Sequence, residues 1–156
     1  MDLLGRKLGM KKGQVFMAFL GEINKIVAQA KGIAGLEGLA QNVQIAANRL
    51  GEIAMHLGQK AMSAEFKTAF AHSLPFLEAM GDTIMGWMLL WRAAVASEKL
   101  ACDTCSKKDT GFYQGQIKTA EFFIRTLLPV TLGKMEAIKD TCPAAIEIDD
   151  EGFGGL

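Results

Sequence analysis

The chain has 156 residues, 50% of them hydrophobic and 22% charged, and its 17 Lys and Arg residues balance 17 Asp and Glu residues. This length predicts one domain, and the balanced charge argues against a nucleic-acid-binding protein, which would show an excess of basic residues. No segment reaches the roughly 18 apolar residues of a membrane span, and Gly21-Glu22 ends the first apolar run too early for a secretory signal. An odd number of cysteines favours reduced thiols, so a soluble cytoplasmic protein is predicted.

The first half of the chain has the apolar spacing of two long helices. A short helical turn is expected over Asp2–Leu8, and the first long helix should open at Gly13 and close at Gly32 and Gly35. Its apolar residues recur every three or four positions and are Val15, Phe16, Phe19, Leu20, Ile23, Ile26, Val27 and Ala30. The second helix has Leu36, Leu39, Val43, Ala46, Leu50, Ile53, Leu57 and Ala61. Each series predicts one buried helix face.

The second half of the chain predicts two further helices. Ser63 is expected to cap the third, with Glu65 in its first turn, and Asp109 is expected to cap the fourth. The predicted stripe of the third helix is Phe66, Phe70, Leu77, Met80, Ile84, Trp87, Trp91 and Ala94, widened by Met85, Met88, Leu89 and Val95. That of the fourth is Tyr113, Ile117, Ala120, Ile124, Leu127, Met135 and Ile138. Because the third helix is apolar over most of its girth, we expect it to be the most buried.

Three prolines divide the second half. Pro75 and Pro129 lie inside apolar-periodic stretches, so a kink or break is expected just before each, and Pro143 is expected to end the last helix. Four long helices joined by short loops predict an all-α, up-down antiparallel bundle over residues 1–146. The acidic, glycine-containing tail 147–156 is expected to be mobile.

Cysteine and histidine are the residue types in this chain that are best suited to redox chemistry or metal binding. Cys102 and Cys105 form a Cys-x-x-Cys motif, a pattern found in redox pairs and in zinc sites. A redox motif usually opens a helix after a strand, whereas this one ends a helix. A zinc site would have to recruit Cys142 with His56 or His72, none of which forms a spaced pair. Incidental reduced thiols are the favoured interpretation, with the redox and zinc roles as alternatives.

The remaining candidates have simpler structural interpretations. Glu52 and His56 are spaced for a weak contact on a helix surface, and Gly5–Gly9 lacks the P-loop pattern of a phosphate site. Trp87 and Trp91 are expected to stack as packing. Five methionines are interpreted as core, although such side chains could also line an adaptable groove: Met55, Met62, Met80, Met85 and Met88. No catalytic, cofactor-binding or metal-binding residue is predicted.

Several stretches along the chain carry a resemblance to a known family. They are Met1–Leu8, Pro75–Gly81, Gly86–Trp87, Arg92–Ala94, Phe112–Phe123, Leu127–Pro129 and Ile148–Phe153. In this order they resemble the C-terminal part of bacterial FAD-dependent acyl-CoA dehydrogenases. The most similar subgroup carries an extra C-terminal helical domain and includes the 3-methylmercaptopropionyl-CoA dehydrogenases.

The resemblance implies that this chain is one part of a longer protein whose catalytic domains lie upstream. Residues 1–31 would end the dehydrogenase's own helical bundle and continue from it, and residues 36–142 would form the extension. FAD, the glutamate base and the acyl-CoA site would lie upstream, with an electron-transfer flavoprotein as partner of the parent enzyme. The fragment itself is expected to hold no cofactor and to act as a scaffolding or oligomer-stabilising domain.

Two further expectations follow from this interpretation. An exposed apolar strip on the first helix should make the isolated chain a dimer or a larger oligomer. The alternative function is a free-standing helical bundle that binds an apolar ligand or a partner helix through its Met and Trp side chains.

Overall fold

A computed structural model describes residues 2–102 and 106–154, and within these ranges the chain is all-α, with seven α-helices of which four are long. The N-terminus forms a single π-helical turn, Leu3–Lys7, followed by a 3-10 turn, Met10–Gly13. The predicted short helical turn is therefore confirmed. Helix α1 spans Gln14–Lys31 and begins directly after Gly13, whose φ of 84° is a left-handed conformation that glycine adopts without strain.

Helix α2 spans Glu37–Ala61 and is the central element of the core. Seven of the eight residues of its predicted stripe, from Leu36 to Leu57, are buried, which confirms the periodicity. The turn before it uses Gly35 at φ 86°, whereas Gly32, which caps α1, keeps a right-handed conformation. Only one of the two glycines predicted to close α1 therefore takes the left-handed conformation.

The predicted third helix is divided into α3, Phe66–Ala71, and α4, Ser73–Leu100. The break falls at His72, just before Pro75, as predicted, because proline is tolerated only within the first turn of a helix. Ser63 does not cap α3, since the residue at that position is Glu65. The Ser63 hydroxyl instead accepts a hydrogen bond from the Glu65 N–H at 3.1 Å within the preceding turn.

The predicted stripe of α4 is wrong. Of its eight residues only Ala94 is buried, and Leu77 and Trp91 are 53% and 45% exposed. The face that α4 does bury consists largely of small residues, and it includes Phe76, Ala79, Thr83, Gly86, Leu90 and Ala93. Small side chains allow the neighbouring helices to approach closely, whereas a helix that is apolar on all sides gives no periodic signal to choose among its faces. Helix α4 buries nine of its 28 residues and α2 nine of its 25, so α2 is buried to the greater extent.

The predicted fourth helix is three consecutive elements: α5, Lys107–Phe122, a π-helical turn, Phe123–Leu127, and α6, Leu128–Asp140. Ser106, not Asp109, caps α5, because its side chain accepts a hydrogen bond from the Asp109 N–H. Pro129 lies in the first turn of α6, and the irregular turn directly before it agrees with the predicted break.

The buried face of this arm departs from the prediction at one position. Ile124 is buried, as predicted, but the next buried residue is Leu128, and Leu127 is exposed. A step of four residues from Ile124, to Leu128, keeps the same helix face as well as the predicted step of three does. The buried series then continues through Thr131, Met135 and Ile138.

The C-terminal end differs from the prediction that Pro143 ends the last helix. Helix α6 stops earlier, at Asp140, where Thr141 takes a left-handed conformation with φ 51°. Pro143 instead precedes one short helix, α7, Ala144–Glu147. The last described residues form a turn in which the Gly152 N–H donates to the Asp149 carboxylate at 2.8 Å.

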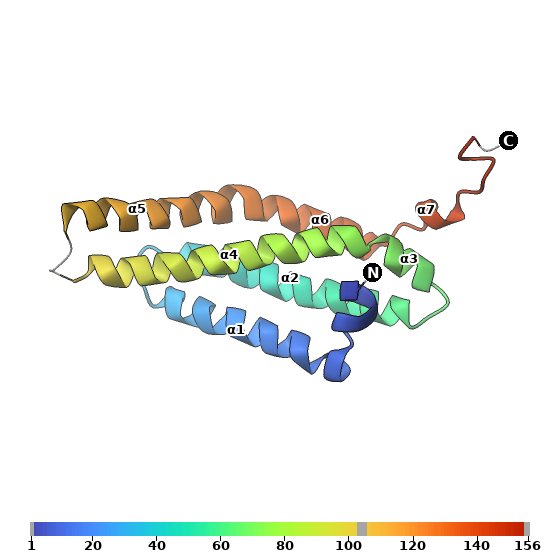
Figure 1. The fold of residues 1–156 in the computed structure, drawn as a ribbon, viewed down its shortest axis with the longest axis horizontal. Coiled ribbons are helices and arrows are strands. Elements are labelled where there is room, and N and C mark those ends of the chain that lie inside the picture. The colour runs from blue at the N-terminus through green and yellow to red at the C-terminus, as the bar shows by residue number, and fades with distance from the viewer. Residues whose placement is uncertain (1, 103–105, 155–156) are drawn as a thin grey trace.

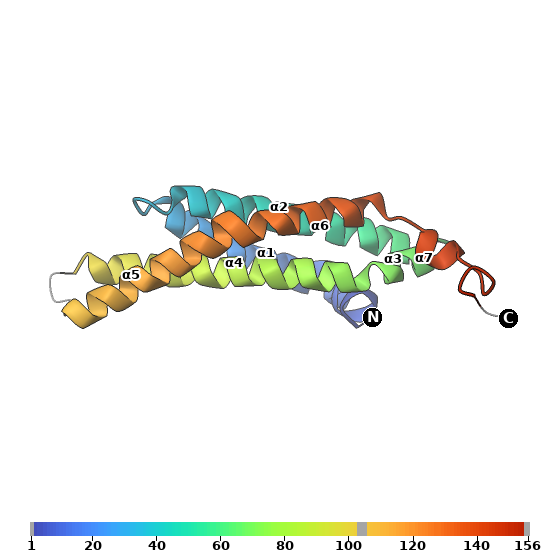
Figure 2. The ribbon, with the colours of Figure 1, turned by 90° about the horizontal axis from the view of Figure 1, so that it is seen from above.

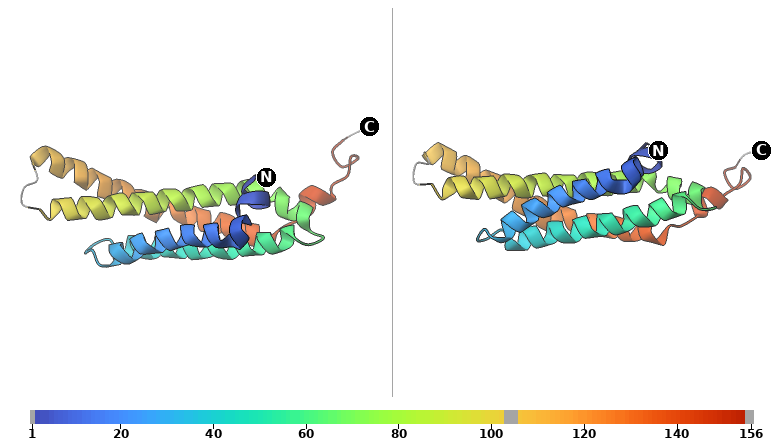
Figure 3. Two further views of the ribbon diagram at one scale, coloured as in Figure 1. Left: turned by 60° about the horizontal axis from the view of Figure 1, so that its bottom comes forward. Right: turned by 90° about the horizontal axis from the view of Figure 1, so that it is seen from below.

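The long elements lie side by side, with α2 packed against α1, α4 and α6. The α5–α6 arm runs obliquely, so that α5 contacts α4 and α6 contacts both α2 and α4 (Figure 2). Seen from below, α1 lies across α2 and α4 (Figure 3). Two apolar clusters form the core. The first includes Ile23, Val27, Val43, Leu90 and Ile124, and the second includes Leu50, Ile53, Leu57, Phe76, Met135 and Ile138.

The exposed apolar side chains are concentrated on α4 and not on α1. Helix α1 exposes only Val15 and Met17 among its large apolar residues. Helix α4 exposes five: Leu74, Leu77, Met85, Trp91 and Val95. The expectation that the first helix carries the bare apolar strip is therefore corrected.

Candidate functional site

The structure does not bring Cys102 and Cys142 together. Cys102 follows the end of α4 and Cys142 follows the end of α6, which lie toward opposite ends of the molecule (Figure 1), and both thiols are free and exposed. Cys105 lies outside the described residues, so the predicted pairing of Cys102 with Cys105 is not tested by the structure. Among the residues described, no group of three His, Cys, Asp or Glu side chains could hold a metal ion.

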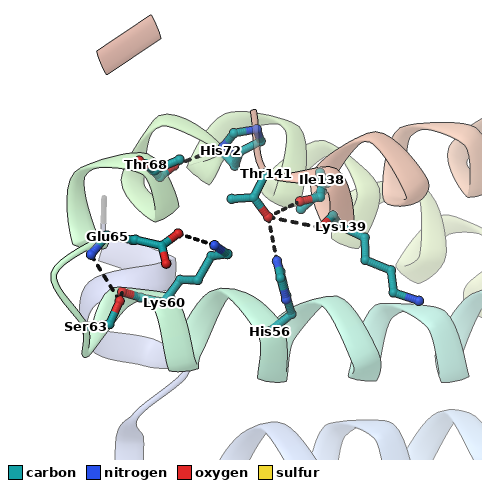
Figure 4. A network of polar contacts seen from close by, with 9 residues as sticks. All are labelled: His56, Lys60, Ser63, Glu65, Thr68, His72, Ile138, Lys139 and Thr141. Carbon is teal, nitrogen blue, oxygen red and sulfur yellow. Dashed lines mark hydrogen bonds and ion pairs between the residues drawn. The ribbon is translucent and has the colours of Figure 1, made fainter. Parts of the chain in front are cut away.

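His56 on α2 forms a contact with the end of α6. Its Nε2 lies 2.5 Å from the Thr141 hydroxyl oxygen, and that hydroxyl faces the carbonyl oxygens of Ile138 at 3.0 Å and Lys139 at 3.1 Å (Figure 4). The hydroxyl hydrogen is directed to these carbonyls, so the oxygen accepts the His56 bond and Nε2 carries a hydrogen. His56 therefore ties α2 to the left-handed turn that ends α6.

The predicted contact between Glu52 and His56 is not formed. Glu52 pairs instead with Arg49, at 3.1 Å, one turn earlier on the same helix. Arg49 also lies 3.6 Å from Glu136 of α6, so these charges link α2 to α6 at the surface. His56 bonds to Thr141 and not to Glu52, because Thr141 is held beside it in a buried turn.

His72 also has a structural role. Its Nδ1 lies 2.9 Å from the Thr68 carbonyl oxygen, one turn earlier, at the break between α3 and α4 (Figure 4). Lys60 at the end of α2 pairs with Glu65 in the turn before α3. These contacts fix the ends of α2, α3 and α6. The hydroxyl beside His56, that of Thr141, is itself held by the Ile138 and Lys139 carbonyl oxygens, so it has a structural role.

Replacing His56 with alanine is expected to lower the free energy of unfolding by about 1 kcal/mol, the net value of one partly buried hydrogen bond. Thr141→Ala should have a similar effect, and the double variant should cost less than the sum of the two, because both remove the same bond. Urea unfolding of the three variants measures this. Strictly additive costs would show that the contact is not formed in solution.

The N-terminal segment around Gly5 packs closely against α3. A Cβ on Gly5 would come within 3.3 Å of the Phe70 ring, so this glycine allows the first turn to approach α3. Arg6 pairs with Asp2 at 2.6 Å, and Lys7 lies 3.9 Å from the same carboxylate. The hydrogen bond from Arg6 holds the pKa of Asp2 below its usual value. The two cations therefore have an acidic partner already.

The methionine and tryptophan side chains are more exposed than predicted. Met55 and Met62 are strongly exposed near the end of α2, and Met85 is half-exposed on α4, so the core interpretation is wrong for these three. Trp87 and Trp91 do stack, with ring centroids 6.4 Å apart and planes inclined by 16°. The Trp87 ring also meets Phe19 of α1 edge-on, while Trp91 remains on the surface.

Sequence analysis missed an apolar pocket between α4 and α5. It has a volume of about 340 Å³, and its lining residues are Trp91, Arg92, Val95, Ala96, Phe112, Tyr113 and Gln116. The side chains of Arg92 and Gln116 are hydrogen-bonded to each other across the two helices. The adjacent aromatic pair Phe112-Tyr113 at the start of α5 was the signal that could have indicated it.

A second pocket of about 330 Å³ is more polar and lies between the start of α2 and α5. Its charged residues are Lys118, Glu121 and Arg125, and Glu121 accepts from Lys118 at 2.8 Å and from Arg125 at 3.0 Å. The Lys118 hydrogen bond and charge lower the pKa of Glu121, with Arg125 adding to the effect. The charges in this pocket are thus paired with one another.

Residues 19–149 match the family described as acetyl-CoA dehydrogenase C-terminal like, and the chain belongs to this family. Within residues 2–102 and 106–154, every helix is too short or too polar to cross a membrane.

Named relatives are dehydrogenases. Over 97% of this chain, identity is 29% with a butyryl-CoA dehydrogenase of Syntrophomonas wolfei and 27% with the broad-specificity linear acyl-CoA dehydrogenase FadE5 of Mycobacterium tuberculosis. Over 90% of the chain, it is 31% with 3-methylmercaptopropionyl-CoA dehydrogenase of Ruegeria pomeroyi. The aligned regions cover 25%, 26% and 23% of these enzymes, so the chain spans about a quarter of their length.

Proposed function

We propose that this chain is an auxiliary, non-catalytic C-terminal domain of a cytoplasmic, FAD-dependent acyl-CoA dehydrogenase. The observation that carries the proposal is the extent of the match: 97% of the chain aligns with the Syntrophomonas wolfei enzyme but only 25% of that enzyme is covered. The contacts of the candidate chemical residues support it. Glu52 pairs with Arg49 along α2, and His56 and His72 form hydrogen bonds at helix ends.

In the whole enzyme, an acyl-CoA thioester would lose its α-proton to a base and its β-hydride to FAD, with an electron-transfer flavoprotein receiving the electrons. We place the base, the flavin site and the acyl pocket in the remaining domains. Residues 1–31 would continue the dehydrogenase bundle and residues 36–142 would form the extension. The side-by-side long helices support an up-down antiparallel arrangement that serves as a scaffold and stabilises the oligomer, with the tail 147–156 mobile.

The pocket between α4 and α5 favours a second candidate, a free-standing module that binds an apolar ligand or a partner helix. Its volume of about 340 Å³ lies within the range of small-molecule sites, and its lining is largely aromatic and aliphatic. This function would need no further domain of the same chain.

The reading frame that encodes the chain distinguishes the two candidates. The dehydrogenase proposal expects the frame to extend upstream into flavin-binding and acyl-binding domains. A frame that starts at Met1 behind its own ribosome-binding site would overturn that proposal and favour the free-standing module.

A further inference from the structure

The pocket between α4 and α5 combines an apolar lining with a single charged side chain. The two helices run side by side at the end of the molecule that lies away from α7 (Figure 1). Trp91, Val95 and Ala96 line the pocket from α4, and Phe112 and Tyr113 line it from α5. A lining that is mostly apolar with a few polar groups is typical of small-molecule sites, in which the polar groups fix the orientation of the ligand.

Three aromatic rings surround the opening of this pocket. Trp91 stacks on Trp87 with one face of its ring and is still 45% exposed, so the opposite face is available to a ligand. The rings of Phe112 and Tyr113 meet edge-on, with centroids 5.4 Å apart, and Phe112 is 60% exposed. Aromatic rings gain energy beyond simple area burial when they contact another ring, either stacked or edge-on. The lining therefore favours a planar aromatic ligand over a flexible aliphatic chain.

Arg92 is the charged residue of the lining, and its partner is neutral. Its Nη2 donates a hydrogen bond to the side-chain oxygen of Gln116 across the two helices. The ion pairs formed within residues 2–102 and 106–154 do not include Arg92. A guanidinium has five N–H donors in one plane, so the bond to Gln116 positions the group and leaves other donors for a ligand. A carboxylate is the anion that fits such a planar group with two parallel hydrogen bonds.

The acidic residues nearest to the pocket along the chain are turned to other partners. Glu98 of α4 accepts a hydrogen bond from Gln29 of α1 at 2.9 Å, and Asp109 of α5 accepts one from the Ser106 hydroxyl at 2.7 Å. Neither carboxylate lines the pocket. The first turn of α5, Lys107–Asp109, carries two positive charges and one negative charge. The charges around the pocket therefore favour an anionic ligand over a neutral or cationic one.

We propose that the pocket between α4 and α5 binds a small aromatic carboxylate. The planar ring of the ligand lies against Trp91 and the Phe112-Tyr113 pair, and its carboxylate accepts hydrogen bonds from the Arg92 guanidinium. Binding is non-covalent and leaves the ligand unchanged. The inference goes beyond the auxiliary role proposed above and does not depend on it, because all of the lining residues belong to this chain.

Titration of the nitrogen-labelled chain with 2-naphthoate tests the site. The chain has two tryptophans, and their indole N–H signals in proton–nitrogen correlation spectra are distinguished by the variant Trp91→Phe. The Trp91 signal is expected to shift saturably, with one ligand bound per chain. The absence of a saturable shift of this signal would overturn the proposal.

Two comparison ligands test the chemical class. The neutral alcohol 2-naphthalenemethanol keeps the ring and lacks the charge, so it should bind about tenfold more weakly, as expected for the loss of a hydrogen bond between charged groups. Nonanoate keeps the carboxylate and replaces the ring with an aliphatic chain, so it should bind about threefold or more weakly. Equal affinity for the alcohol would show that the carboxylate is not recognised, and equal affinity for nonanoate would show that the ring is not. Either result would overturn the assignment.

Arg92→Gln should raise the dissociation constant of 2-naphthoate by about tenfold and leave that of the alcohol unchanged. Lys99→Gln is the matched control, because it removes an exposed cation from the same helix that does not line the pocket, and it should change the affinity by less than about twofold. Far-UV circular dichroism verifies that both variants are folded. An Arg92→Gln chain that binds as tightly as wild type, or an equal loss in Lys99→Gln, would contradict the proposed contact. The dehydrogenase role is tested separately by the reading frame and by flavin binding, so the two proposals can fail independently.

Discussion

Replacing Phe76 with alanine is expected to lower the free energy of unfolding by about 3 to 5 kcal/mol. Phe76 is fully buried at 0% exposure in the second core cluster, where α4 meets α2 and α6. Removing its ring takes away a large apolar surface and leaves a cavity that the surrounding helices can fill only in part. Urea unfolding followed by circular dichroism gives the value.

Phe122→Ala is the matched control, because the same side chain at the end of α5 is 62% exposed. Its loss should cost less than about 1 kcal/mol. Equal costs for the two variants would contradict the packing of α4 described above.

Gly86→Leu is expected to destabilise the fold by about 2 to 3 kcal/mol, even though leucine is the better helix former by up to about 1 kcal/mol. A Cβ at this position would lie 3.2 Å from Leu128 of α6 and 3.7 Å from Val43 of α2. The contact is therefore a close approach of three helices, and a larger side chain would separate them.

The same substitution at Gly58 on α2 provides the comparison, since no atom lies within 4 Å of its Cβ position. Gly58→Leu should be neutral or stabilising. Thermal unfolding of both variants measures the difference, and a Gly86→Leu chain as stable as wild type would show that α4 and α6 do not meet closely.

The sequence predicted the fold well where one helix face is apolar and the other polar. Helix α2 buries its predicted series because that face carries most of its large apolar side chains, with Ile45 and Met55 exposed elsewhere. On α4 the prediction chose the larger side chains, whereas the structure buries small ones such as Ala79 and Gly86, which permit close helix packing. Leu127 was chosen although the adjacent Leu128 is the buried residue, because steps of three and of four both keep one helix face.

The contacts of the candidate residues depend on tertiary structure and were harder to predict. Thr141 lies 85 positions from His56 in the chain, and nothing in the local pattern of α2 indicates that partner. The apolar pocket combines Trp91 and Val95 of α4 with Phe112 and Tyr113 of α5, so it exists only once the two helices are packed. The family resemblance, in contrast, could be found from short stretches in their order along the chain, and the family match confirmed it.

The most direct test of the central claim is flavin binding and turnover by the purified chain. After incubation with FAD and gel filtration, the chain is scanned for visible flavin absorbance and then mixed with butyryl-CoA and an artificial electron acceptor. The butyryl-CoA dehydrogenase of Syntrophomonas wolfei, treated in the same way, serves as the positive control. We predict that this chain elutes colourless and does not reduce the acceptor. A yellow chain that reduces the acceptor when butyryl-CoA is added would contradict the assignment of a non-catalytic domain.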